Sequence, residues 1–156
     1  MIACLFAAGL FAPSMGQAQS DDSDDITVAC YYLHNHHPRD ARDDRVKGDG
    51  WAEWKLVKEA RPCFEGHQQP KVPAWGYTDE KDPKEMARKI KAAADNGIDV
   101  FIFDWYYYDD GPFLNRALDE GFLGAKNCEK LQFALMWANH DWLDIHPYTK
   151  GNEQKI

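Results

Sequence analysis

Apolar residues fall into three continuous runs that are typical of buried β-strands. These runs are Ile26–Leu33, Ile98–Tyr108 and Leu131–Trp137. β-Branched and aromatic residues dominate them, and such side chains pack well on a pleated surface. Near-continuous apolarity is also the pattern of strands that are covered on both faces of a parallel sheet. The sequence therefore predicts three buried strands.

The clearest predicted helix precedes the second strand. Asp82 is a good N-cap residue, and Pro83 suits the first helical position, where no backbone N–H is needed. Met86 and Ile90 stand four residues apart and mark one apolar face. Gly97 supplies the left-handed residue that commonly ends a helix.

The remaining segments are shorter or less regular. The spacing of apolar residues predicts short helices in Trp51–Ala60 and Phe113–Leu123. The polar segment His34–Gly50 is predicted to be a long loop, and long ordered loops are often functional. Prolines and glycines interrupt Arg61–Tyr77, which is expected to be irregular.

Alternation of strands with helices predicts an α/β fold built on a parallel sheet. A parallel sheet of only three strands would have open edges and a small core. We therefore expect the folding unit to continue past Ile156.

The N-terminal residues read as an export signal. Residues 1–12 are almost wholly apolar, and Gly16-Gln17-Ala18 has the small-x-small pattern of a signal-peptidase site, although no Lys or Arg precedes the apolar run. The alternative is a buried apolar helix. The run is too short to be a stable membrane span. The expectation is a signal peptide at 1–18, an acidic linker at 19–25, an incomplete folded domain from 26 to 156, and a secreted or periplasmic protein.

Composition narrows the class of partner. The formal net charge is −8, which argues against nucleic acid because phosphate binding needs clustered Lys and Arg. Aromatic residues make up 13% of the chain and lie beside acids and histidines. Aromatic rings fill ordinary cores, but they also present flat apolar faces to ligands. Their clustering with polar residues favours a ligand site.

Each predicted strand ends in polar and aromatic residues. His34–Pro38 follows the first strand, Asp104–Asp110 ends the second, and Trp137–Trp142 ends the third. In parallel α/β folds, ligands bind at the carboxyl ends of the strands. Sugars need carboxylates and amides for their hydroxyl groups and an apolar surface for the ring. The pattern therefore predicts one carbohydrate site shared by the three strand ends.

Several of these features have a plainer interpretation. The histidines at 34, 36 and 37 could bind a metal, face the substrate or lie in a solvated loop. Asp104 could serve the site, cap a structure or form an ion pair, and Asp141 could serve the site or cap the following turn. The sequence has no Gly-x-Ser-x-Gly turn and no phosphate-binding glycine loop. The spacings of the cysteines match no zinc pattern, so no metal or cofactor is predicted.

Four segments, in order, resemble the WbsX-type proteins. Gly50–Trp54 and Ala60–Pro70 match a Trp-Glu-Trp-like segment followed by Pro-x-Phe-x-Gly-His-x-Gln-Pro. Asn96–Tyr107 resembles the second strand of that family, and Met136–Trp142 resembles its third. The WbsX-type group is similar to glycoside hydrolase family 99, which contains endo-acting α-mannosidases with a (β/α)8 TIM barrel.

The resemblance implies a partial (β/α)8 TIM barrel that comprises about the first three βα units. It also implies hydrolysis of an α-linked oligosaccharide or polysaccharide by two glutamates in an Asn-Glu-Trp-x-Glu-Gly-like motif. These 156 residues contain no such motif, so we assign no catalytic residue. Substrate-binding roles are predicted, from the strand ends and the family pattern together, for His36, His37, Glu53, Trp54, Asp104, Trp105, Tyr107, Asn139, His140, Asp141 and Trp142.

Two other functions are compatible with the same residues. WbsX-type proteins are often described as glycosyltransferases, which typically bind a nucleotide sugar through an Asp-x-Asp metal pair. Asp43-Asp44 and Asp109-Asp110 occur in the part predicted to fold, which has no Asp-x-Asp; the one Asp-x-Asp of the chain, Asp22-Ser23-Asp24, lies in the predicted linker. A non-catalytic carbohydrate-binding protein would also use aromatic strand ends.

Overall fold

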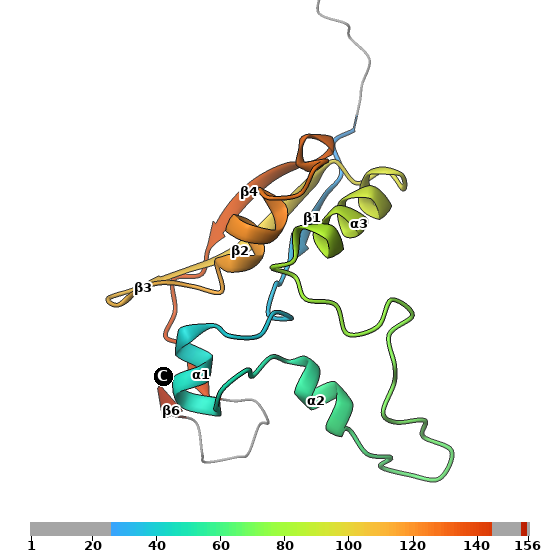
Figure 1. The fold of residues 1–156 in the computed structure, drawn as a ribbon, viewed down its shortest axis with the longest axis vertical. Coiled ribbons are helices and arrows are strands. Elements are labelled where there is room, and N and C mark those ends of the chain that lie inside the picture. The colour runs from blue at the N-terminus through green and yellow to red at the C-terminus, as the bar shows by residue number, and fades with distance from the viewer. Residues whose placement is uncertain (1–25, 145–153, 156) are drawn as a thin grey trace, which may run out of the picture.

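A computed structural model of the chain describes residues 26–144 and 154–155. The expected signal peptide and linker lie outside the described residues. Three parallel strands form the centre of the fold: β1 (Ala29–Tyr32), β2 (Val100–Tyr108) and β4 (Gln132–Trp137). β2 lies between the other two, and Phe101 is paired with Cys30 on one side and Phe133 on the other (Figure 1). The predicted parallel sheet is confirmed, but the burial expected of its strands is not: every residue of β4 is exposed, and β1 alternates between exposed and half-buried residues.

One face of this sheet packs against helices. α3 (Pro83–Ala94) and the π-helical turn η1 (Ala117–Phe122) contribute buried side chains, which meet Phe101 and Phe103 of β2. Figure 1 shows both elements on the same side of the strands. This apolar layer is the main core, and its burial is the principal force that holds the sheet and helices together.

α3 forms as the sequence predicts. The side chain of Asp82 accepts a hydrogen bond from the backbone N–H of Lys84 at 2.8 Å, and Pro83 occupies the first turn. Met86 and Ile90 are fully buried, so the apolar face of the helix is the face that meets the sheet. Gly97 has a φ of 80°, which is the left-handed conformation expected of a residue beyond a helix end.

Two predicted segments differ in the structure. The expected single helix over Phe113–Leu123 is instead a short strand, β3 (Gly111–Phe113), followed by η1. β3 pairs antiparallel with the end of β2, where Tyr107 faces Pro112. The backbone of Leu114 then takes a φ of 59°, which separates strand from helix. The helical spacing of apolar residues correctly predicted η1, but it gave no indication of the β2–β3 hairpin that precedes η1.

The predicted long loop after β1 contains a helix. α1 (Ala41–Lys47) begins after Asp40, whose Oδ1 accepts a hydrogen bond from the N–H of Arg42 at 3.0 Å. It ends at Gly48, which has a φ of 96°. The loop prediction was wrong over these residues because α1 is polar and lacks an apolar stripe; a cap and tertiary contacts stabilise it instead.

The other elements are small. α2 (Trp54–Glu59) confirms the short helix predicted after Trp51, and the chain from Ala60 to Thr78 contains no regular helix or strand. η2 (Cys128–Lys130) is one 3-10 turn before β4. β5 (Leu143–Asp144) and β6 (Gln154–Lys155) form an antiparallel pair.

The architecture is mixed α/β with a parallel central sheet, as expected of a partial α/β fold. A closed barrel stays a prediction. Within the described ranges, no helix combines the length and the apolarity needed to cross a membrane. The thiols of Cys30, Cys63 and Cys128 are free.

Candidate functional site

The ends of β2 and β4 share one cavity with the loop before α2. This strand-end cavity has a volume of about 290 Å³. Asp104 lies on β2, Asp141 follows β4, and Glu53 precedes α2. The two aspartates therefore line the same cavity, as the parallel sheet predicted. The complete lining is Leu33, Glu53, Asp104, Tyr106, His140, Asp141, Trp142 and Leu143.

Two polar atoms in the lining are buried without a hydrogen-bond partner among the described residues. They are Oδ1 of Asp104 and Nε1 of Trp142. An unmade hydrogen bond at a buried group costs free energy, so such atoms are rare in folded proteins. One atom accepts and the other donates, and together they provide both kinds of hydrogen bond for a polar ligand.

The indole of Trp142 is fixed by its neighbours. Its ring meets Tyr106 edge-on at 5.0 Å between centroids and Phe113 edge-on at 4.9 Å. His140 lies nearly parallel to it, at 6.5 Å and 16°. These contacts hold an aromatic surface beside the two aspartates, and aromatic pairs of this geometry are favourable.

Tyr106 lines the cavity together with Asp104. Burial raises the pKa of its hydroxyl to about 12, and the nearby charge of Asp104 acts in the same direction. The hydroxyl therefore stays protonated at neutral pH and can donate a hydrogen bond.

The loop after β1 positions Glu53. The side-chain amide of Asn35 donates to Oε1 of Glu53 at 3.0 Å, while Nε2 of His36 lies 3.9 Å from Oε2. The His36 ring also stacks at a tilt on Trp54, with centroids 4.3 Å apart. His36 thus lies behind the strand-end cavity, where it contacts two other predicted site residues.

The buried side chain of Glu80 fixes the loop that contains His36. Glu80 accepts hydrogen bonds from the backbone N–H of His36 at 3.0 Å, the Tyr32 hydroxyl at 2.7 Å and the Lys89 ammonium at 2.6 Å. Burial raises the pKa of Glu80, but Lys89 and Tyr32 lower it more strongly, so the carboxyl stays ionised at neutral pH. Nothing in the local sequence pattern marks Glu80 as part of this network.

The side chains of His34 and His37 are buried inside the loop after β1. Both are 1% exposed, so the interpretation of a solvated loop was wrong for them. Nδ1 of His37 lies 2.9 Å from the carbonyl oxygen of His34. Burial lowers the pKa of both imidazoles, which are therefore neutral at pH 7. No group of three or more His, Cys, Asp or Glu residues within 26–144 is arranged to hold a metal ion.

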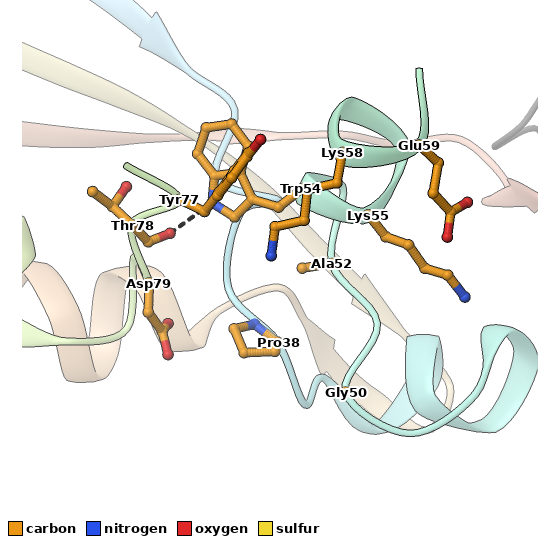
Figure 2. A pocket seen from close by; sticks show the side chains of 10 residues that line it. All are labelled: Pro38, Gly50, Ala52, Trp54, Lys55, Lys58, Glu59, Tyr77, Thr78 and Asp79. Carbon is orange, nitrogen blue, oxygen red and sulfur yellow. Dashed lines mark hydrogen bonds between the residues drawn. The ribbon is translucent and has the colours of Figure 1, made fainter. Parts of the chain in front are cut away.

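Trp54 lines a second, separate cleft of about 400 Å³ (Figure 2). Its indole N–H donates to the carbonyl oxygen of Thr78 at 2.7 Å, and Tyr77 meets the ring edge-on at 5.4 Å. The ammonium of Lys58 lies 4.5 Å from the centre of the Tyr77 ring. Figure 2 shows these side chains around an aromatic wall with a charged rim.

Five of the predicted residues line neither opening: His36 and His37, described above, and Trp105, Tyr107 and Asn139. Trp105 and Tyr107 alternate along β2 with Asp104 and Tyr106, so they face the opposite side of the sheet, where their rings stack at 5.5 Å. Asn139 is exposed beyond the end of β4 and does not line either opening. Their predicted roles stay predictions. Tyr106, which was not among the predicted site residues, shares the cavity with Asp104 because of the same alternation.

Comparison of the sequence with known families gives a match to the family described as glycosyltransferase WbsX, over residues 28–156. This range includes every described helix and strand. The chain belongs to the WbsX family.

Curated relatives of this WbsX-family chain include the uncharacterized protein WxcX from two strains of Xanthomonas campestris pv. campestris. Each is 33% identical over 117 residues, which is 74% of this chain. The same alignment covers 16% of WxcX, so the chain spans less than a fifth of the length of these relatives.

The family-pattern residues of the WbsX-family chain have distinct positions. Glu53 lines the strand-end cavity, and Trp54 lines the cleft beside it. His67 stacks on Phe64 at 4.6 Å and accepts a hydrogen bond from the N–H of Cys63 at 3.2 Å, so it orders an exposed turn. WbsX proteins are carbohydrate-active, which fits a cavity that combines carboxylates with indole and phenol rings.

Proposed function

We propose that this chain binds one sugar residue of an α-linked glycan in the strand-end cavity, as part of an exported glycoside hydrolase. The observation that carries the proposal is the pair of unpartnered buried atoms, Oδ1 of Asp104 and Nε1 of Trp142, in one cavity. Sugar hydroxyls both donate and accept hydrogen bonds, so a single ring can satisfy both atoms.

The size and chemistry of the cavity support this assignment. A volume of about 290 Å³ is near the lower end of small-molecule sites. Trp142 and Tyr106 offer aromatic surface for the C–H face of the ring. Asp104, Asp141 and Glu53 supply carboxylate oxygens for its hydroxyls. A negative lining also disfavours an anionic ligand in this cavity.

Hydrolysis is proposed from the resemblance to glycoside hydrolase family 99, which implies two catalytic glutamates beyond the motifs present here. The three carboxylates of the cavity are assigned to binding. The family description favours a second candidate, transfer of a sugar from a nucleotide donor. A hydrolase consumes water and a transferase consumes a nucleotide sugar, so experiments with and without a nucleotide sugar separate the two activities.

Binding is tested by tryptophan fluorescence during titration with α-mannobiose, with cellobiose as the β-linked comparison. Asp104→Asn and Trp142→Phe are each expected to weaken binding by about tenfold, because each removes one hydrogen-bonding group from a buried site. Asp119→Asn and Trp75→Phe are matched controls on exposed residues and should bind normally. Equal losses in the controls would show that the cavity is not the site.

Activity is tested by incubating the longest natural form of the protein with α-manno-oligosaccharides. New reducing ends without any nucleotide sugar support hydrolysis. Elongated products that appear only with a nucleotide sugar overturn it in favour of a transferase. Binding without either product would identify a carbohydrate-binding protein.

Export is proposed from residues 1–18 alone. Fusion of residues 1–25 to a reporter that is active only outside the cytoplasm should give signal, and a fusion that starts at Ile26 should not. A reporter that stays inactive with both fusions would contradict export.

A further inference from the structure

A cavity of about 450 Å³ lies between α1 and the β2–β3 hairpin. In Figure 1, α1 is the helix next to the hairpin that carries β3. Its lining contains four arginines and two aspartates, although the whole chain has a net charge of −8. We call it the arginine cavity. It is lined by Arg39, Asp40, Ala41, Arg42, Arg45, Asp110, Pro112, Asn115 and Arg116.

Two of the arginines converge on one carboxylate. Arg42 forms an ion pair with Asp110, and Nη2 of Arg45 lies 3.3 Å from the other oxygen of Asp110. The Arg42 side chain is only 10% exposed, and its guanidinium lies 4.5 Å from the centre of the Tyr108 ring. Stacking and burial fix the plane of the guanidinium, which is the geometry that recognises carboxylate and phosphate groups.

Asp110 occupies the position that an external oxyanion would take. Its side chain is half exposed, as is that of Arg45, so solvent and ligands reach this ion pair. Exposed ion pairs contribute little to stability. Exchange of the Asp110 carboxylate for a ligand oxyanion is therefore inexpensive.

Backbone strain is concentrated at the same place. Within residues 26–144, Arg39 (φ 68°) and Leu114 (φ 59°) are the non-glycine residues with positive φ. Both are tied to Asp40, which follows Arg39 in the chain and accepts a hydrogen bond from the N–H of Leu114 at 3.0 Å. The carbonyl oxygen of Arg39 accepts a hydrogen bond from Nη1 of Arg116 at 2.9 Å. Such strain persists only where surrounding contacts enforce it, and it gathers at ligand-binding positions.

One aromatic ring separates the arginine cavity from the strand-end cavity. Phe113 lies 5.6 Å from the guanidinium carbon of Arg42 on one side, and its ring meets Trp142 on the other. Arg42 of one cavity and Trp142 of the other therefore contact the same ring. The two cavities have opposite lining charges, which suits a ligand with a neutral ring and a neighbouring acidic one.

We propose that the arginine cavity binds the oxyanion of an acidic sugar, either a carboxylate or a phosphate ester, with Arg42 and Arg45 as its main partners. The sugar identity rests on the function proposed above, whereas the oxyanion site rests only on the arginine cavity. Asp110 acts as an internal competitor that holds the two guanidiniums in place until the ligand arrives.

The test is calorimetric titration of the purified chain with glucuronate, glucose 6-phosphate, inorganic phosphate and, as a neutral probe, methyl α-glucoside. Arg45→Gln should weaken binding of both acidic sugars by about five- to tenfold, through loss of charge-assisted hydrogen bonds. Asp110→Asn should strengthen it several-fold by removing the competitor. Arg61→Gln removes an equal charge from an exposed position outside the lining and should have no effect.

Each other result has a definite meaning. Absence of binding by all three anions overturns the oxyanion site, as does equal weakening in Arg45→Gln and Arg61→Gln. If inorganic phosphate binds as tightly as the acidic sugars, the assignment of the ligand as a sugar is wrong, and the cavity is a site for a free anion. Asp104→Asn should lose α-mannobiose binding but keep glucuronate binding, so failure of the strand-end cavity and failure of the arginine cavity are distinguishable.

Discussion

The carboxylate of Glu80 accepts a hydrogen bond from the backbone N–H of His36 at 3.0 Å, although 44 residues separate them in the chain. The same carboxylate binds Lys89 of α3 and Tyr32 of β1. One buried side chain therefore connects the sheet, the covering helix and the loop that positions Glu53. This connection explains how a long polar loop acquires a fixed conformation beside the strand-end cavity.

Glu80→Gln should lower the free energy of unfolding by about 2–4 kcal/mol, because it leaves a mostly buried ammonium without its charge partner. Urea unfolding measures the loss, and Glu129→Gln, an exposed change in η2, should cost under about 0.5 kcal/mol.

The pKa of Glu80 is lowered in the folded state, so its contribution is present above pH 4.5 and is lost as the pH falls through the lower folded pKa. The difference between wild type and Glu80→Gln should therefore shrink in acid; a difference independent of pH would contradict the ion pair.

Asp43→Asn should stabilise the protein at alkaline pH. Burial raises the pKa of Asp43 from 3.8 to about 7, and the charge of Asp40 adds to the effect. A raised carboxyl pKa means that its stabilising contribution is complete below pH 3.8 and is lost as the pH rises through about 7. Asparagine stays neutral, so its advantage should grow from near zero at pH 4 to at most about 4 kcal/mol at pH 8. Thermal unfolding across this range measures it. Asp119→Asn, on the surface, should show no such trend.

Two aspartates that cap helices should differ in importance. Among the described residues, the Asp82 side chain accepts only from the N–H of Lys84 in its own helix, so Asp82→Ala should cost about 1 kcal/mol. Asp40 accepts from Arg42 in α1 and also from the N–H of Leu114, which is buried. Asp40→Ala should therefore cost about 2–3 kcal/mol. Chemical unfolding of the two variants compares them directly, and equal costs would argue against the link between α1 and the β3 segment.

Gly121 is predicted to tolerate no side chain. A Cβ at this position would overlap the backbone carbonyl oxygen of Glu80, so Gly121→Ala must displace either η1 or the segment that carries Glu80. We expect a loss of about 2–3 kcal/mol and weaker glycan binding. Gly66→Ala is the comparison: its backbone is left-handed but its surroundings are open, so it should cost about 1 kcal/mol and leave binding unchanged. Calorimetric unfolding and fluorescence titration of both variants test the contrast.

The fold was largely predictable where one local signal dominates. The three apolar runs gave the strands, and Asp82, Pro83 and Gly97 gave the limits of α3 closely. The α1 helix and the β3 hairpin were not predictable. α1 is polar and depends on Asp40, which also binds the backbone N–H of Leu114, and β3 depends on a three-residue pairing with the end of β2. Both depend on partners that are distant in sequence.

The candidate site divides in the same way. The sequence by itself determined that acidic and aromatic residues end the strands, because apolar runs and their polar tails are local features; this placed Asp104 and Asp141 together. Only the tertiary structure decided which face of β2 each side chain takes, so that Tyr106 joins Asp104 while Trp105 and Tyr107 turn away. It also decided that Glu80 supports His36, and that four arginines line one cavity with Asp110. Alternation along a strand sets which residues share a face, but which face meets the cavity, and which charges pair across the chain, depend on packing between elements that are distant in sequence.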